Sequence, residues 1–130
     1  MREGLQASGT ASPREGDVFH SECVGRAIME DISGRWSTLI LAALRDRPMR
    51  FFELRDKIEG ISEKVLSQKL RVLVRDGLVE RTVEPSVPPK VSYALTDLGR
   101  GLTRPLGQLV RWIAAHAPEV VAARESYDAG

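Results

Sequence analysis

Residues 62–77 read Ser62-Glu63-Lys64-Val65-Leu66-Ser67-Gln68-Lys69-Leu70-Arg71-Val72-Leu73-Val74-Arg75-Asp76-Gly77. On a helix at ~100° per residue, the three leucines fall within ~60° of one another. The opposite side carries Lys64, Gln68, Arg71 and Arg75. Ser62 is a preferred N-cap, and Gly77 is a preferred C-terminal stop. The stretch therefore predicts one helix over residues 63–76, with a leucine face and a basic face that has no carboxylate.

Such a helix suits the reading of a DNA groove. Its apolar face would anchor it to its own domain, while the basic and amide side chains would offer hydrogen-bond donors to base edges and phosphates. A plain amphipathic surface helix shows the same division, and its lysines and arginines are then simply solvated. The pattern alone leaves both interpretations open.

Three shorter helices are expected before this one. Apolar spacing predicts helices over residues 24–32, 36–44 and 52–58, with Pro48 ending the second and a short extended piece at 50–51. Gly60 is the expected stop of the third. Two short helices, a turn and a capped helix make a helix-turn-helix candidate.

A hairpin and a last helix are expected afterwards. Residues 78–83 are rich in β-branched residues and predict one strand, and residues 91–95 predict a second, with the proline-rich stretch 85–89 between them. Thr96 would cap a final helix that Pro105 should kink or split. Its apolar stripe consists of Leu98, Leu102, Leu106, Leu109 and Ile113.

The expected fold class is mainly α with a small β-hairpin, a winged helix-turn-helix in which the strand pair closes on the helical core. Residues 1–19 read as a mobile N-terminal tail and residues 118–130 as a frayed C-terminal tail. One DNA-binding and dimerisation domain is left between them, over residues 20–117. Arg81 and Lys90 lie near the two ends of the hairpin, where a wing would touch phosphates.

The charge of the chain supports a polyanionic partner. The 130 residues carry a net charge of +1, yet residues 45–91 alone hold eleven Lys/Arg against eight Asp/Glu. This excess lies where DNA would be met. The chain shows no signal-peptide core or bilayer-length apolar run, and Cys23 is its single cysteine, so a cytoplasmic protein without internal disulfides is expected.

Few residues offer other chemistry. His20 and His116 have no cysteine or carboxylate at ligand spacing, so no metal or other cofactor is expected. A nucleophilic pair of Cys23 with His20 would lack an orienting group, which argues against an enzyme. Two interpretations of Cys23 are open. It could be a reactive thiolate favoured by a helix N-terminus, or a small buried residue at a subunit interface.

The chain resembles the HxlR family of winged-helix regulators over about residues 23–112. The segments that carry the resemblance are Ser33-Gly34-Arg35-Trp36, Arg50-Phe51-Phe52-Glu53-Leu54, Gly60-Ile61-Ser62, Val65-Leu66-Ser67-Gln68-Lys69-Leu70, Asp76-Gly77-Leu78-Val79-Glu80-Arg81 and Leu95-Thr96-Asp97-Leu98-Gly99-Arg100. The most distinctive is the proline-rich stretch Pro85-Ser86-Val87-Pro88-Pro89-Lys90-Val91-Ser92-Tyr93. Phe52 stands where the family often has a polar residue, so it would add core or line a ligand surface.

The resemblance implies a homodimeric transcription factor on double-stranded DNA, with the terminal helices forming the dimer. Residues 62–75 would be the recognition helix and residues 85–90 the wing tip. Several relatives resemble redox or electrophile sensors through an N-terminal cysteine, which makes Cys23 a candidate sensor and a small molecule the alternative effector.

We expect Lys64, Gln68 and Arg71 to face base edges at an inverted repeat. Five further residues are expected to hold phosphates: Ser62, Ser67, Arg75, Arg81 and Lys90. Two rival functions stay open, a winged-helix module that binds protein and never DNA, and an enzyme that uses Cys23.

Overall fold

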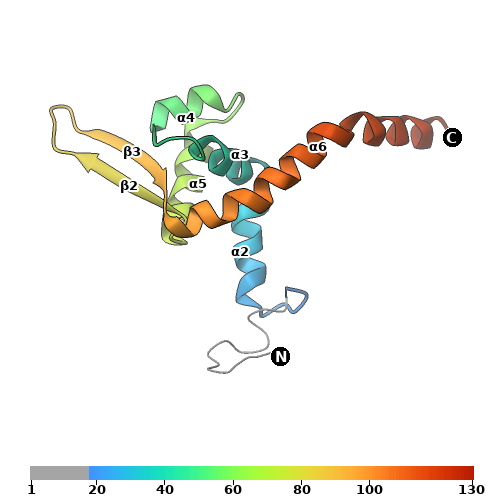
Figure 1. The fold of residues 1–130 in the computed structure, drawn as a ribbon, viewed down its shortest axis with the longest axis horizontal. Coiled ribbons are helices and arrows are strands. Elements are labelled where there is room, and N and C mark those ends of the chain that lie inside the picture. Colours follow the sequence, from blue (N-terminus) through green and yellow to red (C-terminus); the bar gives the residue numbers. More distant parts are fainter. Residues whose placement is uncertain (1–17) are drawn as a thin grey trace.

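The computed structural model describes residues 18–130. The predicted mobile tail, residues 1–19, lies almost entirely outside this range. The elements follow in the order α2 (Val24–Ser33), α3 (Arg35–Leu44), β1 (Met49–Arg50), α4 (Phe51–Lys57), α5 (Glu63–Arg75), β2 (Val79–Glu84), β3 (Lys90–Leu95) and α6 (Asp97–Ala129). Figure 1 shows the β2–β3 hairpin and the end of α6 projecting from opposite sides of a helical body.

The sheet has three antiparallel strands in the order β1-β3-β2. The prediction that the hairpin closes on helices alone is therefore wrong, because β1 adds a third strand through the pair Met49 and Tyr93. A two-residue strand is too short to show alternation in the sequence. Met49 is buried, so this pairing joins the hairpin to the core as well as to the chain before α4.

The core forms around the leucine face of α5. Leu66, Leu70 and Leu73 are at most 1% exposed and join Ile40 and Leu41 of α3 in one cluster. α5 also packs against β2 and α2. Full burial of a leucine side chain stabilises a fold by about 1.5–3 kcal/mol, so this face alone fixes which way α5 is turned.

The start of α6 is fixed by a close approach to the end of α5. Thr96 caps α6 by accepting a hydrogen bond from the Gly99 backbone N–H at 3.0 Å, and its hydroxyl donates to the Gly77 carbonyl at 2.6 Å. Gly99 is buried against the backbone of Leu78. A Cβ on Gly99 would overlap the Leu78 carbonyl oxygen and lie 3.3 Å from Leu95 Cδ2.

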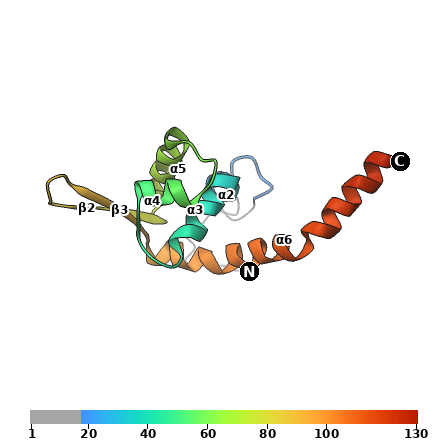
Figure 2. The same ribbon diagram turned by 90° about the horizontal axis from the view of Figure 1, so that it is seen from above.

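α6 is one helix of 33 residues. Of the two alternatives predicted for Pro105, a kink or a split, the split is wrong, since the helix continues through Pro105. The predicted fraying of residues 118–130 is also wrong, because the helix runs through Pro118 to Ala129. A proline removes one backbone donor, and strong helix formers such as Ala122, Ala123 and Glu125 follow. Figure 2 shows α6 bending in its second half, the part of the helix that contains Pro118.

The contact at Gly99 yields a stability prediction. Gly99→Ala should lower the free energy of unfolding by about 1–3 kcal/mol or more, because the added methyl group has no room against the Leu78 backbone. Gly101→Ala is the matched control on the same helix, where nothing lies within 4 Å of the new Cβ. It should be neutral or stabilising by up to about 1 kcal/mol. Urea denaturation measures both, and equal stabilities would contradict the prediction.

Candidate nucleic-acid interface

The polar face of α5 is exposed as predicted. Lys64, Gln68, Arg71 and Arg75 are all exposed, opposite the buried leucines. None of them takes part in an ion pair within residues 18–130. Uncompensated cations on a rigid helix are what the binding of a polyanion requires. Ser67 is half-buried on the same helix, so it lies nearer the body than the others.

The N-terminus of α5 is held by two interactions. The Ser62 hydroxyl oxygen accepts a hydrogen bond from the Val65 backbone N–H at 3.1 Å, which confirms the predicted cap. Glu63, in the first turn, pairs with Arg55 of α4 at 2.9 Å. Hydrogen bonds to Asp56 and then to Glu63 raise the pKa of Arg55 above its ordinary value. Arg55 therefore braces α4 against α5, and two carboxylates already neutralise it.

The C-terminus of α5 meets α2 through two acidic residues. Asp76 caps α5, and its Oδ2 is buried without a hydrogen-bond partner among the described residues. Burial, and then the nearby carboxyl of Asp31 on α2, raise the pKa of Asp76. The junction between the basic helix and the first helix of the domain is therefore less stable when Asp76 is ionised than when it is protonated.

The hairpin β2–β3 forms the expected wing. Arg81 lies opposite Tyr93, and Lys90 lies opposite Glu84 at the start of β3. Arg81 shares a sheet face with Val79, which is buried, so it lies on the side of the wing that faces the body. At the tip, Val87 is fully exposed, its peptide bond to Pro88 is cis, and the Ser86 hydroxyl donates to the Pro88 carbonyl at 2.7 Å.

A concave surface lies between the wing and the start of α4, and we call it the wing hollow. It has a volume of about 630 Å³. Arg50, Arg81 and Lys90 give it three cations, and Phe52 and Val87 are among its apolar residues. Its lining holds no carboxylate. The sequence did not single out Arg50, because only the pairing of β1 with β3 brings this residue to the wing.

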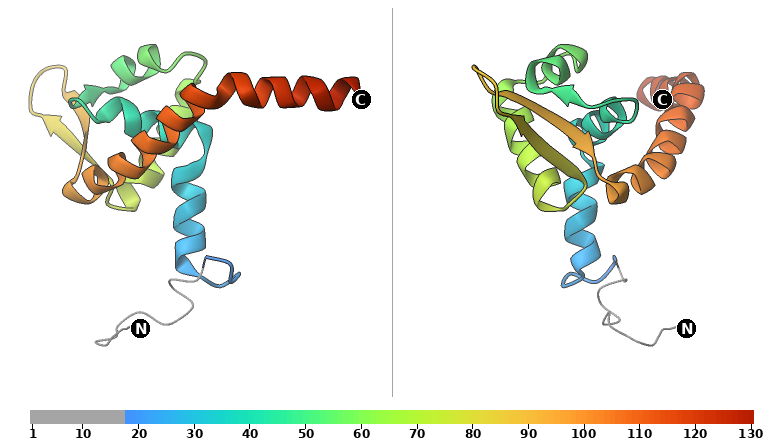
Figure 3. Two further views of the ribbon diagram at one scale, coloured as in Figure 1. Left: turned by 45° about the vertical axis from the view of Figure 1, so that its right-hand side comes forward. Right: turned by 60° about the vertical axis from the view of Figure 1, so that its left-hand side comes forward.

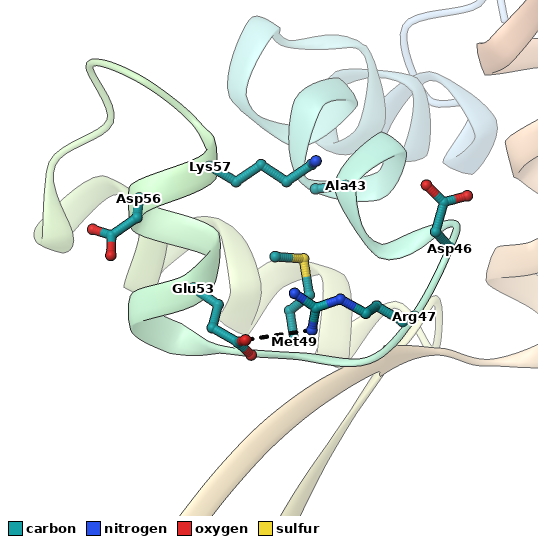
Figure 4. Close-up of a pocket in the computed structure, with 7 residues that line it drawn as sticks. All are labelled: Ala43, Asp46, Arg47, Met49, Glu53, Asp56 and Lys57. Carbon is teal, nitrogen blue, oxygen red and sulfur yellow. Dashed lines mark hydrogen bonds and ion pairs between the residues drawn. The ribbon is translucent and has the colours of Figure 1, made fainter.

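A second hollow, of about 490 Å³, lies between the end of α3 and α4 and has mixed charge. Figure 4 shows Arg47 and Glu53 joined across it, with Lys57, Asp46 and Asp56 around its rim. The ion pair between Arg47 and Glu53 measures 3.4 Å. A backbone hydrogen bond from Arg50 and the charge of Arg47 lower the pKa of Glu53. Its cations are balanced by carboxylates, so it does not share the anion preference of the wing hollow.

Apolar side chains are exposed on α2 and on the far part of α6. The predicted stripe of α6 divides: Leu102 and Leu106 pack on the core, while Leu98, Leu109 and Ile113 are more than half exposed. Residues 109–129, which we call the α6 arm, lie almost wholly outside the body in Figure 3. The exposed apolar residues of α2 are Val24, Ile28 and Met29, and those of the arm are Leu109, Val110, Trp112, Ile113, Val120, Val121 and Tyr127.

Cys23 is the N-cap of α2 and is only 3% exposed. Its backbone N–H donates to the His20 carbonyl at 3.0 Å, and its carbonyl accepts from the Arg26 N–H. His20 belongs to this turn, whereas His116 stacks on Trp112 in the arm with ring centroids 4.5 Å apart. Within residues 18–130, no three His, Cys, Asp or Glu side chains gather where they could hold a metal ion. No helix of this range is long and apolar enough to cross a membrane.

Known proteins share this arrangement. The HxlR-like helix-turn-helix family matches residues 31–121. The HTH-type transcriptional regulator YtfH of Escherichia coli is 42% identical over 120 residues, which is 92% of this chain and 95% of YtfH. The solved structure of the transcriptional regulator YtfH from Salmonella typhimurium has a TM-score of 0.81 and 43% identity, over 85% of this chain and 99% of that one. The reduced form of the redox regulator HypR has a TM-score of 0.71 and 32% identity, over 75% and 97% of the two chains.

The fold and its basic helix define a winged helix-turn-helix protein, a DNA-binding transcriptional regulator. Within that class, the chain belongs to the HxlR-like helix-turn-helix family.

Proposed function

We propose that this regulator binds duplex DNA as a homodimer at an inverted repeat, without enzymatic activity. The observation that carries the proposal is the polar face of α5. Its four long donors are exposed and free of ion pairs within residues 18–130, while the opposite face is buried. Because its partner is DNA, we expect the protein to act in the cytoplasm.

The eight residues that we propose for DNA contact divide into base-edge contacts and phosphate contacts. Lys64, Gln68 and Arg71 stand on the outer face of α5 and would meet base edges, where arginine pairs with guanine and glutamine with adenine. The other five would hold phosphates and set the register of the helix. These are Ser62 and Ser67, at and within the first turns of α5, Arg75 at its end, and Arg81 and Lys90 on the wing.

A second copy of the chain is the partner that we propose for the exposed apolar residues of α2 and the α6 arm. The arm has hardly any contact with its own body, and it carries a long series of apolar side chains that water would solvate poorly. A twofold dimer would bury these residues and would present two copies of α5. Two recognition helices about 34 Å apart match successive major grooves, which is why an inverted repeat is the expected operator.

A winged-helix module that binds only protein is the alternative function. The alternative does not explain why the outer face of α5 and the lining of the wing hollow lack compensating carboxylates. An electrophoretic shift with the DNA upstream of the protein's own gene separates the two. A retarded complex that unlabelled duplex of the same sequence competes away supports DNA binding, and the absence of any complex supports the module.

Cys23 is our proposed site of a redox response. It caps α2, which carries part of the proposed dimer surface, and the related HypR is a redox regulator. Since the chain has one cysteine, oxidation would join the Cys23 thiols of two subunits or one Cys23 with another thiol. Because the side chain is 3% exposed, the start of α2 must open before the thiol reacts. A small-molecule effector is the alternative signal.

The two classes of DNA contact predict different losses. Arg71→Ala should weaken operator binding by about 1–3 kcal/mol and relax the preference at one base pair. Lys90→Ala should weaken binding to all sequences alike and reduce the slope of log K against log salt by about 0.9, because one phosphate contact is lost. Fluorescence anisotropy on operator and unrelated duplexes measures both. Arg104→Ala, on α6 before the arm, removes an exposed cation and is the control, and losses no larger than its own would refute these assignments.

The exposed apolar residues of the α6 arm predict that the protein is a dimer in solution. Leu109→Asp should convert the dimer to a monomer at micromolar concentration, because a buried, unpaired carboxylate costs several kcal/mol. Gln108→Asp introduces the same charge at the neighbouring exposed position and should leave the dimer intact. Light scattering gives the mass of each. A monomeric wild type, or a dimer that survives Leu109→Asp, would count against the interface.

The redox proposal predicts a thiol-dependent change in DNA binding. Diamide, which oxidises two thiols to a disulfide, should change the operator affinity of the wild type by about tenfold or more, equivalent to about 1.4 kcal/mol. Cys23→Ser should bind the operator as well as the reduced wild type and should not respond. If diamide leaves the wild type unchanged, or changes the serine variant equally, Cys23 is not the sensor.

A further inference from the structure

The wing hollow combines positive charge with an exposed aromatic ring. Its cations come from β1, β2 and β3: Arg50, Arg81 and Lys90. Lys90 lies across the ladder from Glu84, whereas Arg50 and Arg81 lie opposite the uncharged Ser92 and Tyr93. Across the ladder, neither arginine therefore faces a carboxylate, and Arg50 also lowers the pKa of Glu53 on α4, by its backbone hydrogen bond and by its charge.

Phe52 stands on the α4 side of this hollow and is 56% exposed. The expectation that it adds to the core is wrong, while a ligand-lining position fits its place. An isolated exposed phenyl ring is common, but this one is held in place. Its ring and that of its neighbour Phe51 meet in a T-shaped arrangement with centroids 5.3 Å apart, and the Arg55 guanidinium lies 4.7 Å from the Phe52 centroid.

The residue that holds Phe52 is itself fixed. Arg55 donates hydrogen bonds to Asp56 at 3.0 Å and to Glu63 at 2.9 Å, and Glu63 lies in the first turn of α5. The orientation of Phe52 is therefore tied to the helix that reads DNA. With its charge balanced by two carboxylates, Arg55 is a positioning residue and not a phosphate contact.

We propose that the wing hollow holds one sugar–phosphate unit of the DNA backbone, with Arg50 and Arg81 binding the phosphate and Phe52 packing on the deoxyribose. This inference rests on the proposed function. The bases of a duplex are paired and stacked, so the sugar is the apolar surface that its backbone offers to an aromatic ring. A phosphate alone would account for the two arginines but not for an immobilised phenyl ring beside them. The proposal adds Arg50 and Phe52 to the contacts expected from the sequence.

The dependence of affinity on salt distinguishes the proposed phosphate contact from the proposed contact with the deoxyribose. Arg50→Gln should weaken binding and flatten the slope of log K against log salt by about 0.9, since it removes one cation–phosphate pair. Phe52→Ala should weaken binding about three- to tenfold, because it removes apolar burial at about 25 cal/mol per Å². It should leave the salt slope unchanged, since no counterion is released at an apolar contact. Phe52→Leu should restore most of the affinity.

The measurement uses the full chain and 30-base-pair duplexes, one selected by the protein from a random pool and one unrelated in sequence. Both variants should lose affinity by the same factor on the two duplexes, because a backbone contact reads no sequence. The controls are Phe19→Ala and Arg104→Ala, which remove an exposed phenyl ring and an exposed cation from segments outside the hollow and outside the α6 arm. Thermal denaturation should show unchanged stability for all of these variants, since none of the side chains is buried.

Three results would overturn the inference. If the selected duplex binds the wild type, and Arg50→Gln and Phe52→Ala match their controls, the hollow does not touch DNA although the proposed function stands. If Phe52→Ala flattens the salt slope as Arg50→Gln does, the ring acts through the cations and does not pack on a sugar. If the wild type binds neither duplex, the proposed function fails together with the inference.

Discussion

The burial of three leucines on α5 is the interaction on which the rest of the structure depends. Leu66, Leu70 and Leu73 are in contact with the core and together stabilise the fold by several kcal/mol. Their spacing gives α5 one favourable rotation about its axis, since a turn by one residue would bury a basic side chain without a partner. The core therefore decides which side chains point outward, and the surface that we propose faces DNA is a consequence of packing.

The sequence predicted a helix or strand correctly wherever its pattern of apolar residues was long enough to repeat. The thirteen residues of α5 contain three turns of the apolar pattern, and the cap at Ser62 marks its start, so this helix and its outward donors could be predicted residue by residue. The wing was equally clear, because a proline-rich turn stood between the β-branched run 78–83 and a second short strand at 91–95. The fold class needed nothing beyond the order of these elements.

What the sequence could not show was contact between distant segments. β1 has two residues and no detectable period, yet its pairing with β3 creates the wing hollow and brings Arg50 into it. The length of α6 was underestimated from the sequence. Pro105 and Pro118 each disfavour a helix locally, but the surrounding residues that favour a helix offset this cost. The division of the α6 stripe into packed and exposed leucines likewise depends on where the body ends, which no single-chain pattern encodes.

A hydroxyl-radical footprint on duplex selected by the protein from a random pool tests the central claim most directly, namely that the outer face of α5 reads DNA from a twofold dimer. The account predicts two protected half-sites on one face of the duplex, with centres about one helical turn, ~34 Å, or a multiple of that distance apart, and an inverted-repeat sequence across them. Protection of a single site without symmetry, or no protection at protein concentrations that saturate its dimer, would contradict it.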